Sequence, residues 1–134
     1  MAVVHSLASA TTALAISELR WTYRPVLIFA PALDDARIRQ QTVALARDRG
    51  ALAARSMVVI TIVAGTVSAE GGPRSKLSAA SLRSRFGVGP SEFRIILVGK
   101  DGGEKLSSGA PVTADRLFAT IDAMPMRRQE MRDR

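Results

Sequence analysis

The chain contains no cysteine in its 134 residues, which excludes disulfide bonds, thiolate metal ligands, cysteine nucleophiles and dithiol redox chemistry. Histidine, the usual general base and metal ligand, occurs once, as His5 near the N-terminus. Most familiar catalytic and metal-binding arrangements therefore lack the side chains they need. We expect no catalytic residue, no metal site and no cofactor, and the balance favours a protein that is not an enzyme.

Lysine and aromatic residues are also scarce, with three lysines and six aromatic rings in the whole chain. Lysine and arginine together number 19 against 12 acidic residues, so the formal net charge is +7 and comes mostly from arginine. The arginines are scattered rather than gathered in a stripe, and few rings are present to stack on bases, which argues against nucleic acid as a partner. The arginines cluster only near the C-terminus, at Arg127, Arg128, Arg132 and Arg134.

The N-terminal segment, residues 1–18, consists mainly of small and apolar residues. It is too short and too rich in Ser and Thr to span a bilayer, and no other segment predicts a membrane span. It is typical either of the remnant of an export signal or of an N-terminal helix. The first alternative slightly favours a periplasmic or secreted location over a cytoplasmic one. Residues 19–134 have the length of one domain with one hydrophobic core.

Two apolar runs, 25–30 and 57–63, predict buried strands. The segment between them predicts a helix of about four turns, with Asp34 and Asp35 at its start and Gly50 at its end. A helix that connects two strands of one sheet makes them parallel. Residues 64–74 are rich in glycine and small residues and predict a loop.

The second half of the domain predicts two helices and a hairpin. In chain order these are a helix between Ser78 and Gly87, a strand over 93–99, a turn at 101–103, a polar edge strand over 104–107 and a helix that begins at Thr113. Pro125 interrupts the last helix and leaves a charged tail or an extra turn. The order β-α-β-α-β-β-α predicts an α/β fold with a central mixed sheet of about four strands and flanking helices. This is the order of elements in the thioredoxin core.

Three stretches of the chain carry a family resemblance. They are Leu19, Arg20 and Trp21 with Arg24, residues 97–103, and above all residues 121–131, with the run Asp-Ala-Met-Pro-Met-Arg-Arg-Gln-Glu. Together they resemble the peroxiredoxin-like P-DUDES domain, a domain of unknown function that occurs alone in bacterial proteins and as a module in secreted animal matrix proteins, including sushi-repeat-containing ones. The resemblance extends from Leu19 to Met131. It implies a thioredoxin-like fold, but it brings no established activity and no catalytic residue.

In thioredoxin-like enzymes the reactive cysteine lies between the first strand and its helix, where the helix N-terminus lowers the thiol pKa. This chain has Asp34 and Asp35 there, and two carboxylates at a helix start are good caps and poor nucleophiles or bases. Pro90 stands near the position at which thioredoxins keep a cis-proline. Its spacing to Phe93 is longer than in thioredoxins, which leaves both isomers open.

The candidate binding residues are Arg127, Arg128 and Glu130 in the C-terminal run, with Lys100 and Asp101 before the hairpin turn. In one interpretation the arginines pair with carboxylates such as Asp122 and pin the tail. In the other they grip an acidic partner or a small anion. Turn chemistry accounts for Lys100, Asp101 and the glycines that follow better than a phosphate-binding loop, because the spacing of such a loop is missing.

Two functional hypotheses follow from the sequence. The first is a non-catalytic binding or structural module on a thioredoxin-like scaffold, with an unknown protein or a small anionic ligand as its partner. The alternative is an enzyme or antioxidant of peroxiredoxin-like fold that works without cysteine. The first is favoured, because fold alone is a weak argument for activity and the usual catalytic side chains are missing.

Overall fold

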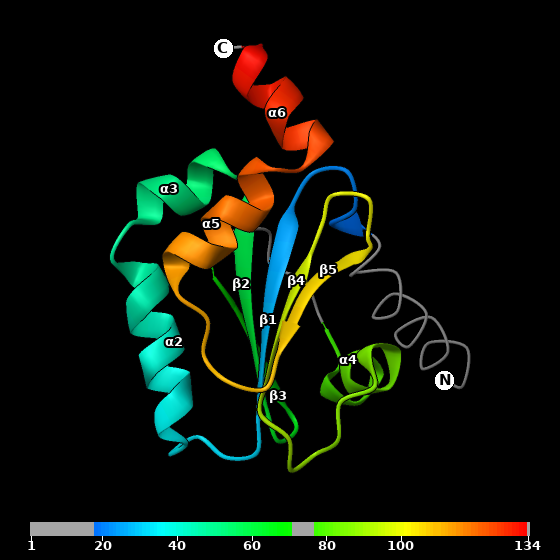
Figure 1. Ribbon diagram of the computed structural model, residues 1–134. Coiled ribbons are helices and arrows are strands. Elements are labelled where there is room, and N and C mark those ends of the chain that lie inside the picture. Colours follow the sequence, from blue (N-terminus) through cyan, green and yellow to red (C-terminus); the bar gives the residue numbers. More distant parts are fainter. Residues whose placement is uncertain (1–17, 71–76, 134) are drawn as a thin grey trace, which may run out of the picture.

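The computed structural model describes residues 18–70 and 77–133, which form a mixed α/β domain of five strands and five helices (Figure 1). The strands are β1 (Arg24–Ala30), β2 (Met57–Val63), β3 (Thr66–Glu70), β4 (Arg94–Val98) and β5 (Glu104–Ser108). The helices are α2 (Ala36–Ala46), α3 (Arg49–Ala54), α4 (Ala79–Phe86), α5 (Ala114–Asp122) and α6 (Pro125–Arg132). The expected N-terminal segment up to residue 17, and residues 71–74 of the expected loop, lie outside the described residues.

The five strands form one sheet in the order β3-β2-β1-β4-β5. β1 and β2 are parallel, with Leu27 beside Ile60, because α2 and α3 carry the chain back to the starting end of the sheet. β4 runs antiparallel to β1, with Ile96 beside Leu27 on its other side. β5 then returns antiparallel to β4 at one edge. The predicted parallel pair and the predicted edge hairpin are confirmed.

The loop predicted over 64–74 is wrong from Thr66 to Glu70, where the chain forms β3. Ala64 and Gly65 make a two-residue turn, Ala64 with a φ of 50°, and β3 folds back antiparallel on β2. The sheet therefore has five strands rather than about four. β3 lies at the edge of the sheet, where a strand can pair with its neighbour without an alternating pattern of apolar side chains. Its small and polar residues therefore gave no strand signal.

The single helix predicted between β1 and β2 is two helices. Asp35 caps the start of α2, which ends at Ala46, and the Asp48 carboxylate accepts a hydrogen bond from the Ala51 N–H at the start of α3. Gly50 lies inside α3 rather than at a helix end. Asp48 offers a competing cap in the middle of the predicted helix, and the chain turns there.

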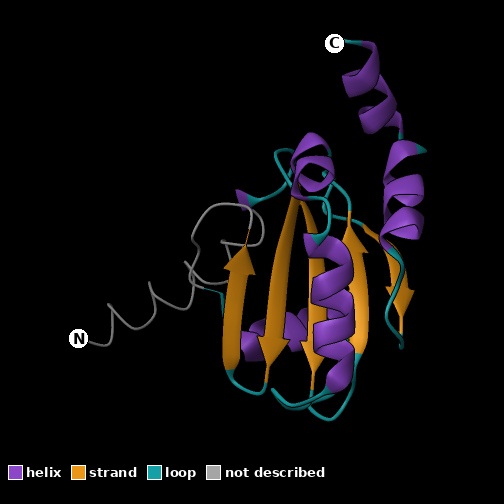
Figure 2. Cartoon of the chain, turned by 90° about the vertical axis from the view of Figure 1, so that its left-hand side faces the viewer, coloured by secondary structure: helices purple, strands orange, loops and turns teal. Residues whose placement is uncertain are grey.

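The remaining helices follow their predicted caps. The side chains of Ser78 and Thr113 cap α4 and α5, and Gly87 ends α4 in the left-handed conformation, at a φ of 67°. The charged segment after Pro125 is the eight-residue helix α6. Proline fits the first position of a helix, so Pro125 starts α6 as well as separating it from α5. In Figures 1 and 2, α6 projects beyond the end of the sheet.

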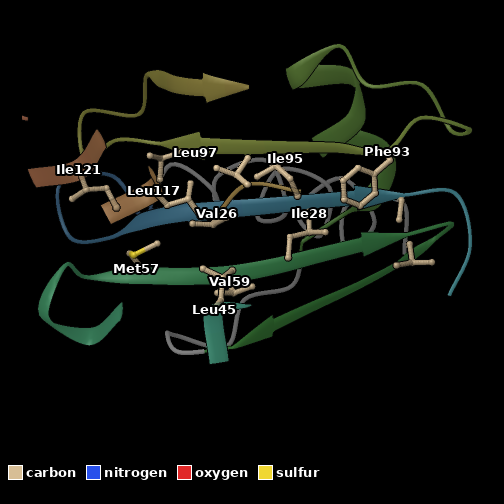
Figure 3. Packing of buried hydrophobic residues seen from close by; sticks show 13 residues of the cluster. Val26, Ile28, Leu45, Met57, Val59, Phe93, Ile95, Leu97, Leu117 and Ile121 are labelled. Carbon is tan, nitrogen blue, oxygen red and sulfur yellow. The ribbon is translucent and has the colours of Figure 1, made fainter. Parts of the chain in front are cut away.

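The hydrophobic core lies on both faces of the sheet. α2 and α5 cover one face, with Leu45, Leu117 and Ile121 packed on β1, β2 and β4 (Figure 3). α4 covers the other face, as Figure 2 shows, and packs Leu82 among the remaining strand side chains. Every residue of β1 is buried, so β1 is the centre of the fold. Its first residue is Arg24, a fully buried arginine.

Candidate functional site

An ion-pair network joins the starting ends of β1 and β2 to the C-terminal helices. It contains three of the five candidate binding residues, Lys100, Arg127 and Glu130. Three further members were not singled out as site residues from the sequence, and these are Arg24, Arg55 and Asp122. Of these three, Arg24 could have been found from the sequence, because it directly precedes the apolar run 25–30. An arginine at the start of a buried strand is itself buried, and a buried guanidinium requires an acidic partner.

Glu130 on α6 accepts hydrogen bonds from two cations, and Arg127 Nη1 lies 3.9 Å from its Oε1. Its carboxylate accepts two hydrogen bonds from Arg24, at 3.2 Å from Nη1 to Oε1 and 2.9 Å from Nη2 to Oε2, and a third from Lys100 Nζ at 2.8 Å. The Arg24 side chain is inaccessible to solvent, whereas that of Glu130 is 28% exposed. Burial raises the pKa of Glu130, but the hydrogen bonds and charges of Arg24 and Lys100 outweigh burial and hold that pKa below its ordinary value.

Asp122, at the end of α5, binds Arg55 and Arg127. Arg55 donates to both carboxylate oxygens, at 3.1 and 2.9 Å, and Arg127 Nε donates to Oδ1 at 3.0 Å. Burial again raises the pKa of Asp122, and the hydrogen bonds from Arg55 and Arg127 more than offset it, so the pKa is lowered. The Arg55 guanidinium also stacks 4.4 Å from the centre of the Phe118 ring.

Arg24 and Arg127 also donate hydrogen bonds to carbonyl groups at the C-terminal end of α3. Arg127 Nη1 donates to the Ala54 carbonyl at 2.9 Å, and Arg24 Nη1 donates to the Arg55 carbonyl at 2.9 Å. The last carbonyls of a helix have no partner within it and form its negative end, so guanidinium groups are well placed there. Arg127 therefore ties α6 to α3, and the interpretation in which it pins the C-terminal segment fits its position.

The network carries more positive than negative charge. Among the described residues it contains four cations, Arg24, Arg55, Lys100 and Arg127, and two carboxylates, Asp122 and Glu130. The Lys100 ammonium has three N–H donors, and within residues 18–70 and 77–133 Glu130 is its one recorded acceptor. Arg24 Nε is buried and has no partner in the same part of the chain. Because the Arg24 side chain is inaccessible to solvent, Lys100 rather than Arg24 has donors available to a ligand.

A groove of about 500 Å³ opens beside this network. Arg24, Lys100 and Lys105 supply positive charge to its lining, and Asp101 supplies one negative charge. Its other side is the junction of α5 and α6, with Met124, Pro125 and Met126 among the lining residues. The groove therefore combines a cationic wall with an apolar wall.

Asp101 and Arg128 lie outside the network. Asp101 belongs to the hairpin turn, where it accepts hydrogen bonds from the Gly103 N–H and Lys105 Nζ, both at 2.9 Å. The hydrogen bond from Lys105 lowers the pKa of Asp101. Arg128 is exposed on α6 and forms no ion pair with any residue the structure describes. Arg127 and Arg128 are therefore not an equivalent pair.

The segment between β1 and α2 lies at the other end of β1 from this network. Asp35 caps α2 and pairs with Arg37 at 2.7 Å, and Asp34 is exposed. The hydrogen bond from the Arg37 side chain lowers the pKa of Asp35. The peptide bond before Pro90 is trans. The described residues hold no group of three or more His, Cys, Asp or Glu that could bind a metal ion.

The lowered pKa values predict a loss of stability in acid. A carboxyl group with a lower pKa in the folded state stabilises that state above its ordinary pKa, which is 4.5 for Glu130 and 3.8 for Asp122, and the stabilisation is lost as the pH falls through the folded value. The free energy of unfolding, measured by urea denaturation, should decrease below about pH 5. Glu130→Gln should flatten this decrease, and an unchanged acid profile in that variant would contradict the assignment.

The different positions of Arg127 and Arg128 predict different effects of replacement. Arg127→Ala should lower the free energy of unfolding by about 2 kcal/mol, because it removes hydrogen bonds to Asp122 and to the Ala54 carbonyl. Arg128→Ala should change it by less than about 0.5 kcal/mol, as expected of an exposed side chain. Thermal and urea denaturation measure both variants. Equal losses would mean that the tail is not held as described.

The fold and the site define a small mixed α/β domain with a basic groove at one end of its sheet. Residues 15–130 match the family described as Domain of unknown function (DUF4174), and the chain belongs to this family. It is 30% identical over 133 residues to "Coiled-coil domain-containing protein 80" of Danio rerio; the match covers 87% of this chain and 15% of that protein. No solved structure matches. No helix in the described ranges is long and apolar enough to cross a membrane.

Proposed function

We propose that this chain is a non-catalytic binding module on a thioredoxin-like scaffold, and that the basic groove binds an acidic segment of a partner protein. The observation that carries the proposal is the charge of the groove lining, in which Arg24, Lys100 and Lys105 accompany a single carboxylate, Asp101. Lys100 reaches the groove with N–H donors to spare, and a carboxylate is the group such donors bind most strongly.

The arrangement of the elements supports the thioredoxin-like scaffold. The strands β2-β1-β4-β5 are neighbours in this order, with one parallel and two antiparallel contacts. α2 and α5 pack on one face and α4 on the other. Both features are those of a thioredoxin core, to which β3 and α6 are additions. The run at residues 121–131 further supports placing the chain with the peroxiredoxin-like P-DUDES domains.

The chemistry of the chain supports a non-catalytic role. The sequence has no cysteine to act where thioredoxin-like enzymes react. At that position the Asp35 carboxylate is engaged with the Arg37 N–H and guanidinium, so it is a capping group rather than a free base. The groove lies at the other end of β1, beside Arg24.

The lining of the groove supports a protein segment as the occupant. Met126 is 39% exposed, and methionine side chains adapt to varied apolar partners. Arg128 is exposed one helical turn after Met124. An acidic segment that also carries apolar side chains would meet both the cationic and the apolar wall, whereas a small inorganic anion would use only the first.

A labelled peptide, Glu-Leu-Glu-Glu-Leu-Glu, tests this proposal by fluorescence anisotropy. It should bind the wild-type chain, and Lys100→Gln should weaken binding about tenfold, because a hydrogen bond between charged groups contributes roughly 1.5–3 kcal/mol. Arg128→Gln should weaken it as well. Arg39→Gln is the matched control, because Arg39 is exposed on α2 away from the groove and has no ion pair within the described ranges.

Three results would contradict the proposal. They are equal binding of the Gln-Leu-Gln-Gln-Leu-Gln peptide, an equal loss in the Arg39→Gln control, and turnover of peroxide or of insulin disulfides by the rigorously purified protein. The last result would favour the alternative of a cysteine-free enzyme or antioxidant.

A further inference from the structure

A second pocket lies on the face of the sheet that α2 and α3 cover, away from the basic groove. Its volume is about 280 Å³. Its lining residues are Thr42, Leu45 and Ala46 of α2, Arg49, Leu52 and Ala53 of α3, Met57, Val59 and Thr61 of β2, and Ser68 of β3. The pocket exists because the chain turns between α2 and α3 and because β3 widens the sheet beyond them.

The lining changes from apolar at the bottom to polar at the mouth. Leu45, Met57 and Val59 are buried, with exposed fractions of 2%, 2% and 9%. Arg49 and Ser68 are exposed at the mouth. A pocket with an apolar floor and a few polar groups at one end is typical of a site for a small amphipathic molecule.

The polar groups at the mouth define the head group that fits. Among the side chains that the structure describes, which do not include that of Glu70, none forms a hydrogen bond or ion pair with the Arg49 guanidinium or with the hydroxyl groups of Thr61 and Ser68. Thr61 and Ser68 are cross-strand neighbours, so both hydroxyls lie on the same face of the sheet. A guanidinium binds a carboxylate through two parallel hydrogen bonds, and hydroxyl groups donate to the same oxygens.

We propose that this pocket binds a small monocarboxylate with a compact apolar tail, the tail between Leu45, Met57 and Val59 and the carboxylate at Arg49. The site is independent of the proposed function, because it shares no residue with the basic groove. The volume suits a tail of about five or six carbon atoms, which is at the small end of ligand pockets.

Hexanoate is the probe, observed through ¹³C-methyl chemical shifts of the full chain. The methyl groups of Leu45, Met57 and Val59 should shift, with a Kd in the millimolar range that a ligand of this size supports. The amide of hexanoic acid, which lacks the charge, should bind about tenfold more weakly, because it forms no charge-assisted hydrogen bond with Arg49.

Two variants separate the head from the tail. Arg49→Gln should reduce the affinity for hexanoate to that for the amide, and Ala46→Leu should abolish the shifts by filling the pocket from an exposed helix position. Arg39→Gln, on the outer side of α2, should bind hexanoate as the wild type does. The proposal is overturned if hexanoate at about 10 mM shifts none of the three methyl groups, or if the Arg49→Gln variant binds as tightly as the Arg39→Gln control. It is also overturned if Ala46→Leu changes the oligomeric state rather than hexanoate binding.

Discussion

Glu130→Ala should lower the free energy of unfolding by about 3–5 kcal/mol, which is the cost of removing one partner from a buried ion pair. Arg24 is inaccessible to solvent and gives Glu130 two of its hydrogen bonds, so the variant leaves a buried guanidinium without its carboxylate. Lys100 loses its recorded acceptor in the same variant. Urea denaturation at pH 7 measures the loss.

A double variant shows whether the buried charge is the cause. Replacing Arg24 by Met as well as Glu130 by Ala removes the unpaired charge, and an apolar side chain of similar volume in place of a buried ion is often neutral or stabilising. The double variant should therefore recover a large part of the stability lost in Glu130→Ala. Additive losses would show that the ion pair is not what holds α6.

Ile96→Ala and Ile60→Ala should each lower the free energy of unfolding by about 2–5 kcal/mol, the range for removing a large buried aliphatic side chain. Both isoleucines are inaccessible to solvent and lie on either side of Leu27, in the layer that α4 covers. Each variant leaves a cavity between the sheet and α4 that rigid neighbouring strands cannot close.

An exposed position is the control for these core variants. Val43 is 45% exposed on α2, and Val43→Ala should change stability by less than about 0.5 kcal/mol. A loss under about 1 kcal/mol at both Ile60 and Ile96 would mean that the core is wrongly placed.

The central strands could be predicted because their sequences are compatible with only one kind of structure, a strand buried on both faces. Residues 25–30 and 57–63 are continuous apolar runs with turn signals around them, and such runs are stable only where both faces are covered. The helix caps at Ser78, Gly87 and Thr113 could also be predicted, because each cap depends on only a few neighbouring residues.

β3 and the break between α2 and α3 could not be predicted with the same rules. β3 is an edge strand whose pairing with β2 does not depend on an apolar pattern of its own, so its small residues resemble a loop. Asp48 competes with the continuation of a helix, and the sequence does not reveal whether a cap or a further turn is the more stable.

The candidate site was found in part. Lys100 and Arg127 both lie beside Glu130, as three of the five candidate residues. The prediction grouped Arg127 with Arg128, but adjacent residues of a helix point about 100° apart, so the two side chains have different surroundings. Asp122 was predicted only as a carboxylate that pairs with the C-terminal arginines, and no sequence pattern marked Arg55 as a site residue. Contacts between α3, α5 and the start of β1 depend on tertiary packing, which local patterns do not encode.

The most direct measurement is a titration of the ¹⁵N-labelled chain with the acidic peptide, followed by amide chemical shifts. We expect the shifts to concentrate at residues 99–101 and 123–126, which line the basic groove, and we expect Lys100→Gln to reduce them at equal peptide concentration. Shifts confined to residues 31–37, between β1 and α2 at the opposite end of β1, or no shifts at all, would contradict this expectation.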